Sequence, residues 1–267
     1  MRMFTVDAFT RQPFKGNPAA VCLLDSDADD TWMRSVAAEM NLSETAFVTG
    51  LDGSQPYSLR WFTPAVEVAL CGHATLATAH VLYSIGAAVE AIQFSTLSGI
   101  LTVNRGPDNL INMDFPANPP ESAPAPEGLT EALGVTPRWV GRSQFDILVE
   151  VESASAVRAL APDIAALKAV EARGVIVTAA ADGEAGEADY VSRFFAPRVG
   201  VPEDPVTGSA HCVLAPYWSE RFARPDLVGA QLSPRGGLVY TRHVSERVML
   251  GGHAVMVMSA DLHATPI

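Results

Sequence analysis

The sequence predicts an α+β protein made of two similar halves, and three observations carry this prediction. A long internal repeat relates the two halves of the chain. Short strand-like segments far outnumber helices, and a proline-rich stretch separates the two copies. Because the chain has 267 residues, it exceeds one average domain, and one large or two modest domains are expected.

The repeat is clearest around two arginine–aromatic–proline motifs. Residues 60–68 and 193–201 match at a constant offset of 133 (193 − 60), with Arg, Phe, Pro, Val and Val in common. Farther along, residues 71–74 match residues 207–210 at an offset of 136 (207 − 71), so the second copy carries three extra residues, which we place around 203–205. Solenoid repeats span about 20–50 residues. This much longer repeat indicates two whole domains of similar build.

Each copy has the same predicted local structure. An alternating segment, 57–62 or 190–195, is typical of a strand. A proline-containing loop follows, and a glycine then begins a helix. The predicted helix runs from Gly72 to Ile85 in the first copy and from Gly208 into Trp218 in the second, where Pro216 disturbs the helical pattern. Further helices are predicted over 30–40, 130–133 and 154–168.

Other strands are predicted wherever apolar and polar residues alternate, at 4–7, 20–24, 46–48, 92–96, 100–103, 111–115, 147–151, 175–178, 238–240, 248–250 and 254–258. Many strands with one long helix per half favour an α+β fold over a doubly wound sheet. The proline-rich stretch 115–126 is the best boundary. We therefore expect domains over 1–117 and 118–267, with a final strand near 256–267 that returns to the first domain.

Composition excludes several classes of function. The net charge is −12, from 30 acidic and 18 basic residues, and no basic cluster indicates nucleic-acid binding. No apolar run reaches the roughly 20 residues of a membrane span, and no apolar signal region follows Met1, so a cytoplasmic protein is expected. The three cysteines form no C-x-x-C pair, and the histidines lack metal-ligand spacing, so no zinc site is expected.

The two glycine-initiated helices are candidate anion-binding sites. The first turn of a helix has unpaired N–H groups and a partial positive charge, and glycine lets a ligand approach the backbone. Gly72 and Gly208, with their neighbours Cys71 and Thr207, are therefore candidate substrate-binding residues. If the halves pack around a pseudo-dyad, both helix ends face one cleft and hold a small carboxylate without Lys or Arg. The structural alternative is two ordinary helix starts.

Three polar side chains are candidates for acid/base chemistry and its support. Glu44 lies between a helix and an apolar strand, where desolvation favours proton transfer near neutral pH. Its counterpart at an offset of 133 is Val177, so this carboxylate belongs to one half only. Asp204 is a candidate second acid/base or orienting group, and His73 can relay a proton. Local pairing of Glu44 and an Asp-Pro turn at Asp204 are the structural alternatives.

Cys71 suggests a different chemistry. A Cys-Gly-His sequence with a matching second loop is similar to the two-cysteine racemases, in which a thiol on each side of the substrate exchanges a proton. Thr207 stands where the second thiol belongs, and this disfavours a two-thiol racemase. No G-x-G-x-x-G unit, Walker motif or H-E-x-x-H motif occurs.

Taken together, these residues resemble the phenazine-biosynthesis PhzF-like family, which is related in fold to diaminopimelate epimerase. The matching segments run along essentially the whole chain and are residues 7–10, 13–21, 41–45, 60–64, 67–68, 71–77, 193–197 and 203–211. The segments Asn-Leu-Ser-Glu-Thr at 41–45 and Glu-Asp-Pro-Val-Thr-Gly-Ser at 203–209 are the most specific of these.

The resemblance implies a fold and a set of roles. The family fold has two pseudo-symmetric domains, each a curved, mostly antiparallel sheet wrapped around a central helix, and its members are usually homodimers. The family's catalytic glutamate falls on Glu44, and its supporting His, Asp and Ser fall on His73, Asp204 and Ser209. The phenazine-pathway member isomerises a dihydro-hydroxyanthranilate by moving a proton, with neither metal nor organic cofactor. This chain differs from that enzyme in carrying Cys71, so the resemblance does not identify its substrate.

We therefore predict a cofactor-independent isomerase that moves a proton on a small carboxylate-bearing substrate, with Glu44 as the acid/base. Two alternatives stay open at this point. One is a non-catalytic small-ligand-binding or protein-interaction module of the same fold. The other is a Cys71-assisted epimerase. The sequence does not identify the substrate, the pathway or the dimer interface.

Overall fold

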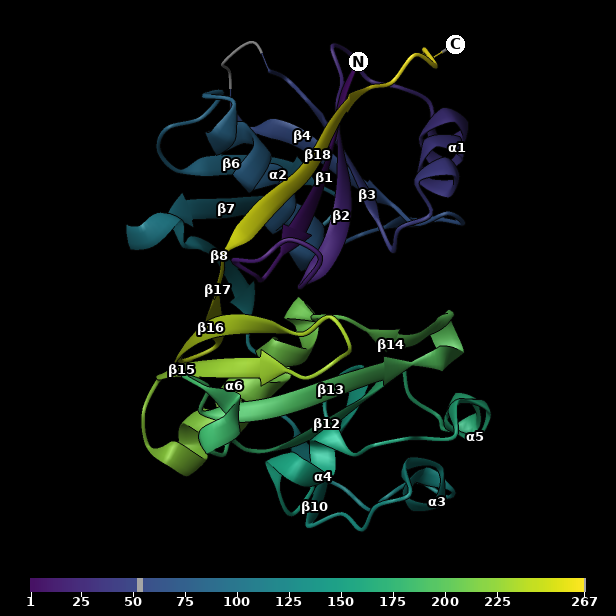
Figure 1. The fold of residues 1–267 in the computed structure, drawn as a ribbon, viewed down its shortest axis with the longest axis vertical. Coiled ribbons are helices and arrows are strands. Elements are labelled where there is room, and N and C mark those ends of the chain that lie inside the picture. Colours follow the sequence, from purple (N-terminus) through teal and green to yellow (C-terminus); the bar gives the residue numbers. More distant parts are fainter. Residues whose placement is uncertain (52–54, 267) are drawn as a thin grey trace. The chain divides into compact units, whose positions relative to one another are not determined.

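The computed structural model describes residues 1–51 and 55–266, which divide into two compact units (Figure 1). The first unit comprises residues 1–114 together with the described residues from Gly251 onward, and the second comprises Phe115–Leu250. The predicted boundary at residue 117 thus differs by three positions. The end of the chain belongs to the first unit and not to the second, although residue 267 lies outside the described residues.

The first unit contains one mixed, mostly antiparallel sheet. Its strands pair in the order β18 (Ala254–Asp261), β1 (Arg2–Ala8), β2 (Asn17–Leu23), β3 (Thr45–Thr49), β4 (Tyr57–Phe62), β6 (Ile92–Thr96), β7 (Gly99–Arg105) and β8 (Ile111–Pro116). The short strand β5 (Glu67–Val68) also pairs with β4. The pairs β2–β3 and β4–β6 are parallel, and the other pairs in this series are antiparallel.

Helix α2 (Gly72–Ser84) is the central helix of this unit and contacts β1, β2, β3 and β18. All residues of 73–79 are buried, as expected for a helix that is apolar on every side. Helix α1 (Asp30–Met40) is capped by the preceding Asp29, whose carboxylate accepts hydrogen bonds from two first-turn amides. Its apolar face packs Trp32 on Phe47 of β3, with ring centroids 6.0 Å apart.

The second unit repeats this topology. Its strands pair in the order β9 (Glu121–Ser122), β10 (Trp139–Arg142), β11 (Asp146–Glu150), β12 (Gly174–Ala180), β13 (Tyr190–Ala196), β15 (Asp226–Gln231) and β16 (Gly237–Val244). Strand β14 (Val201–Asp204) pairs with β13, as β5 does with β4. The pairs β11–β12 and β13–β15 are parallel, so the succession of parallel and antiparallel pairs from β10 to β16 matches that from β1 to β7. Strand β17 spans Arg247–Gly252.

The strand pairing corrects our alignment of the two copies. Phe47 pairs with Arg60, and Val177 pairs with Arg193, so Val177 corresponds to Phe47. The counterpart of Glu44 is therefore Gly174 and not Val177. Trp61 pairs with Val68, and Phe194 pairs with Asp204. Asp204 therefore corresponds to Val68, and the three extra residues precede Glu203 instead of including Asp204.

The central helix of the second unit, α6 (Gly208–Phe222), extends past Trp218 even though it contains Pro216. A proline in a helix has no N–H to donate to the carbonyl four residues earlier. Here that carbonyl, of Cys212, accepts a hydrogen bond of 3.0 Å from the amide of Asn118 instead. The residue before Pro216 is Ala215, and both are buried. The missing internal hydrogen bond is thus replaced, and the helix continues.

Two further differences concern secondary structure. The helix predicted over 154–168 is two short helices, α4 (Ala154–Arg158) and α5 (Ile164–Ala169). Pro162 lies between them, and the carboxylate of Asp163 accepts from the amide of Ala166 to begin α5. The remaining helical segments are α3 (Leu129–Leu133), η1 (Pro107–Asn109), η2 (Gly183–Ala185) and η3 (Pro197–Val199). The sequence analysis missed strands β5, β9, β10, β14 and β15.

Within the described residues, no helix combines the length and apolar character that crossing a membrane requires.

Candidate active site

The first unit brings Glu44 and His73 together. Oε2 of Glu44 lies 3.3 Å from Nε2 of His73. The carboxylate side chain is 20% exposed and the imidazole only 9%, so the pair lies at the edge of the core with one face open to solvent. A carboxylate and an imidazole at this distance can exchange a proton and can hold each other in position.

Two secondary-structure boundaries place this pair. Asn41 follows helix α1, adopts the left-handed conformation (φ 51°, ψ 34°) and turns the chain back toward the sheet. Glu44 then directly precedes β3, whose first residue, Thr45, is fully buried. His73 is the second residue of α2, and the packed helix fixes its backbone.

Cys71 lies beside the same imidazole. Its Sγ is 3.5 Å from Nδ1 and 4.0 Å from Nε2 of His73. Cys71 is the extended residue before α2, and no side chain caps the first turn of that helix. Of the predicted residues in this unit, the structure thus gathers Glu44, Cys71, Gly72 and His73 at one helix start. Ser43, which the sequence analysis did not single out, contacts the same imidazole, with its Oγ 3.4 Å from Nε2 of His73.

The second unit brings Asp204 and Thr207 together before α6. The Thr207 hydroxyl donates a hydrogen bond to Oδ2 of Asp204. Gln231 of β15 fixes this turn, because its amide nitrogen donates to the carbonyl of Asp204 at 2.8 Å and its side-chain oxygen accepts from the amide of Thr207 at 2.9 Å. Gln231 is fully buried, and sequence reasoning missed it because it is 24 residues from Thr207.

Ser209, the second residue of α6, contacts an arginine. Its Oγ accepts a hydrogen bond of 3.0 Å from Arg173, which lies just before β12. Arg173 also forms a two-point pair with the fully buried carboxylate of Asp146 and lies over the rings of Phe145 and Phe194. An arginine therefore lies beside this helix start, which the sequence analysis did not expect.

A family model for phenazine biosynthesis-like proteins (PhzC-PhzF) matches residues 6–260. The chain belongs to this family. An uncharacterized isomerase of Halalkalibacterium halodurans is 47% identical over 263 residues, which cover 97% of each chain. The crystal structure of a PhzF-family phenazine biosynthesis protein from Enterococcus faecalis has a TM-score of 0.92 and 40% identity, covering 98% of this chain and 99% of the other.

The wider fold is shared with epimerases and racemases. A probable proline racemase from Agrobacterium radiobacter superimposes with a TM-score of 0.60 at 10% identity, over 99% of this chain and 93% of that one. Identity at this level supports the fold alone. The phenazine biosynthesis-like fold, with mixed strands and a central helix in each unit, is the fold that the sequence analysis predicted.

In this phenazine biosynthesis-like chain the strand pairing relates the two helix starts residue by residue. Because Gly174 corresponds to Glu44, Arg173 corresponds to Ser43. Ser209 corresponds to His73 at the offset of 136 (209 − 73). The contact between Ser43 and His73 in one unit thus recurs as the contact between Arg173 and Ser209 in the other.

Gly174 leaves no room for a second carboxylate. A Cβ atom at this position would lie 2.3 Å from the ring of Phe194 and 3.3 Å from Oδ1 of Asp146. No side chain can occupy that space without moving the ring. The repeat therefore carries its acidic residue in the first unit only, and the second unit offers hydroxyl and guanidinium groups in the same places.

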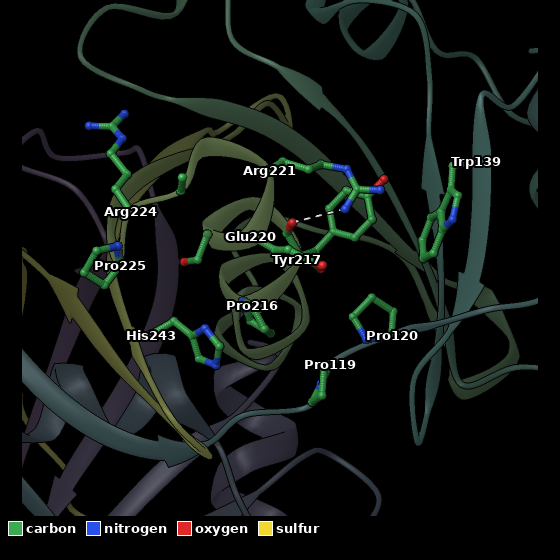
Figure 2. A pocket seen from close by; sticks show the side chains of 12 residues that line it. Pro119, Pro120, Trp139, Pro216, Tyr217, Glu220, Arg221, Arg224, Pro225 and His243 are labelled. Atoms are coloured by element: carbon green, nitrogen blue, oxygen red, sulfur yellow. Dashed lines mark hydrogen bonds between the residues drawn. The ribbon is translucent and has the colours of Figure 1, made fainter.

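A hollow of about 930 Å³ lies elsewhere in the second unit, at the C-terminal end of α6 (Figure 2). Arg221 crosses it, with its guanidinium 3.5 Å from the ring centroid of Tyr217, and Trp139 and His243 also line it. Among the described residues, its lining includes none of the side chains predicted for the site. The hollow is therefore not assigned to the acid/base chemistry, despite its volume.

Proposed function

We propose that this protein is an isomerase that moves a proton on a small carboxylate-bearing substrate. The observation that carries the proposal is the pair formed by Glu44 and His73, 3.3 Å apart at the start of α2. Relatives described as uncharacterized isomerases support the reaction class. The name of the family is not taken as the substrate.

In the proposed mechanism, Glu44 is the acid/base. Its ionised carboxylate removes a proton from a carbon atom of the substrate, and the resulting carboxylic acid returns the proton to another carbon. His73 holds the carboxyl group through Nε2 and donates or accepts a hydrogen bond as the charge on Glu44 changes. The Glu44 side chain is 20% exposed, so a substrate can reach it while the imidazole stays packed.

The backbone at the start of α2 serves as the proposed carboxylate-binding element. The N–H groups of Gly72 and His73 lie in the first turn, where no side chain caps the helix. Their partial positive charge favours an anion. This arrangement gives a substrate carboxylate two donors beside the carboxylate that takes the proton.

Asp204 and Ser209 keep the supporting roles that the family resemblance predicts. Ser209 is exposed at the start of α6 and offers a hydroxyl whose orientation Arg173 restrains. Asp204 accepts from Thr207, and a carboxylate can accept several hydrogen bonds, including one from a hydroxyl or amine of the substrate. We propose that these two residues bind and orient the substrate and do not move the proton.

A Cys71-assisted epimerase is the second candidate, because Sγ of Cys71 lies 3.5 Å from Nδ1 of His73. Such a pair can form a thiolate beside an imidazolium, and a thiolate can remove a proton from carbon. The two candidates differ in which side chain is indispensable. Glu44→Gln abolishes the first activity and Cys71→Ala abolishes the second.

The test is a proton NMR search for isomerisation among cyclic and amino-acid carboxylates, including dihydro-hydroxyanthranilate, with wild type and three variants. Glu44→Gln and Cys71→Ala probe the two candidates, and Glu39→Gln, an exposed residue of α1, is the matched control. We expect turnover to fall at least about 100-fold in Glu44→Gln alone, within the range known for general acid–base catalysis. Unchanged turnover in Glu44→Gln would exclude the proposal.

A further inference from the structure

The start of α2 carries a second set of chemical groups besides an acid/base pair. Glu44, Cys71 and His73 each offer one metal-binding atom, and these three atoms lie within 4.8 Å of one another. It is the one such group among the described residues. Sequence spacing predicted no zinc site, because Glu44 is 27 positions from Cys71 (71 − 44) and the fold alone brings it near.

We propose that Glu44, Cys71 and His73 form a binding site for Zn²⁺ or a similar soft divalent cation, and that the bound cation blocks the acid/base pair. The cation site itself does not rest on the proposed function, because it uses only the three side chains and their geometry. The blocking of the acid/base pair does rest on the proposed function. It concerns an inhibitor and not a resident cofactor.

The geometry is close to that of a zinc site. Zinc binds sulfur at about 2.3 Å and nitrogen or oxygen at about 2.0–2.2 Å, so tetrahedral ligands lie roughly 3.3–3.6 Å apart. Nε2 of His73 is 3.3 Å from Oε2 of Glu44 and 4.0 Å from Sγ of Cys71. The distance from Nε2 to Oε2 lies within this range, and the distance from Nε2 to Sγ exceeds it by about 0.4 Å. A small rotation of the Cys71 or His73 side chain closes that gap, and the 20% exposed side chain of Glu44 can adjust to the cation.

The donor set selects the class of cation. A thiolate, an imidazole and a carboxylate suit zinc and its neighbours, whereas magnesium and calcium prefer oxygen ligands alone. Binding releases the thiol proton of Cys71 to solvent, and the thiolate and carboxylate together then balance the two charges of the cation. The fourth position is left for water.

The second unit supplies an internal comparison. The residues that correspond to Glu44, Cys71 and His73 are Gly174, Thr207 and Ser209. That set contains neither thiol nor imidazole, so the repeat predicts one cation per chain. The other two cysteines are poor ligands, because burial raises the pKa of the Cys22 thiol and that of the Cys212 thiol to about 12.

The test is titration of the chelator-treated protein with Co²⁺, which replaces zinc and reports thiolate binding by a charge-transfer absorption band. Wild type, Cys22→Ala and Cys212→Ala should each bind one cation and show the band. Cys71→Ser should lose the band. Displacement of Co²⁺ by Zn²⁺ should show that this variant binds Zn²⁺ more than about 100-fold more weakly than wild type, which exceeds the loss typical for a residue that only hydrogen-bonds to a metal ligand. Glu44→Gln should keep the band with weaker affinity.

Two results would overturn the inference. One is a band of full intensity in Cys71→Ser, and the other is equal Zn²⁺ affinity in wild type and Cys71→Ser. Circular dichroism of each variant separates loss of the site from loss of folding, and Cys71→Ala serves as the second variant. Because binding is measured without substrate, failure of this inference leaves the proposed isomerase untouched. Failure of the isomerase proposal likewise leaves the cation site untouched.

Discussion

The guanidinium of Arg173 donates a hydrogen bond of 3.0 Å to Oγ of Ser209, and the same guanidinium pairs with the buried carboxylate of Asp146. A residue that no motif marks thus orients a hydroxyl predicted for the site. Asp146 fixes Arg173, and Arg173 fixes Ser209. Arg173 therefore has two separable contacts: its pair with Asp146 contributes to stability, and its contact with Ser209 bears on the substrate binding that we propose for that residue.

Replacing Arg173 therefore has two expected consequences. Arg173→Met leaves the Asp146 carboxylate buried without its partner, and we expect the free energy of unfolding to fall by about 2–4 kcal/mol. Arg173→Lys keeps a charge near Asp146 but cannot bind both groups in the same way. We expect it to raise KM about 10-fold with little change in kcat. Arg142→Met, which removes an exposed arginine of β10, is the control for urea unfolding and kinetics. Equal KM in Arg173→Lys and wild type would show that Ser209 needs no positioning.

The two copies of the arginine–glutamate pair allow a matched measurement of stability. Arg60 binds both carboxylate oxygens of Glu67 at 2.7 Å, and Arg193 binds those of Glu203 at 2.7 and 2.9 Å. The Arg193 side chain is 11% exposed and that of Arg60 is 28%. Because the less exposed pair is less screened, we expect Glu203→Gln to cost about 2–3 kcal/mol and Glu67→Gln about 1–2 kcal/mol. Urea unfolding of both variants tests the order, and a larger cost for Glu67→Gln would contradict it.

His211 should make stability depend on pH. Burial lowers the pKa of this imidazole to about 4, and its Nδ1 donates a hydrogen bond of 2.9 Å to the carbonyl of Thr207. The unfolded chain binds a proton at this residue below about pH 6.5, whereas the folded chain does not until about pH 4. The folded state therefore loses up to about 3 kcal/mol of stability through this residue as pH falls from 6.5 to 4.

The repeat supplies the variant that checks this effect. Thr75 occupies the equivalent position in α2, and its hydroxyl donates a hydrogen bond of 2.6 Å to the carbonyl of Cys71. In His211→Thr, the loss of unfolding free energy between pH 7 and pH 4 should be smaller than in wild type by up to about 3 kcal/mol. Equal pH dependence in the two proteins would show that His211 is not kept neutral by burial.

Gly174 should tolerate no side chain. The Cβ of Gly174→Ala would lie 2.3 Å from the Phe194 ring, and we expect a loss of about 1–3 kcal/mol in the free energy of unfolding. Gly183→Ala is the control, because nothing lies within 4 Å of its added Cβ, and it should change stability by less than about 0.5 kcal/mol. Thermal unfolding of the pair distinguishes a steric effect at Gly174 from a general cost of replacing glycine.

The sequence predicts the elements that local signals define. The alternating segments 57–62 and 92–96 match strands β4 and β6, and the predicted helix over 30–40 matches α1. Each has a clear apolar period, and a capping Asp29 marks the beginning of α1. The repeat adds the second domain, because two matching copies predict a matching architecture even where the local pattern is weak.

Features that depend on distant residues were not predictable. The continuation of α6 beyond Pro216 requires Asn118 to bond the carbonyl that the proline leaves unpaired. The contacts of Ser209 with Arg173, and of Thr207 with Gln231, span 36 and 24 residues and depend on which strands are neighbours. Motif matching located Glu44 and His73, but only strand pairing shows that Gly174 is the counterpart of Glu44.

The most direct test of the central claim, proton transfer by Glu44, is hydrogen exchange measured by proton NMR in D₂O. A small carboxylate that binds wild type should lose the signal of one carbon-bound hydrogen as deuterium replaces it. The same sample with Glu44→Gln should keep that signal, while Glu39→Gln should behave as wild type. Deuterium incorporation at equal rates with wild type and Glu44→Gln would contradict the claim. Another side chain would then be the base that removes the proton, and Cys71 would be the first to examine.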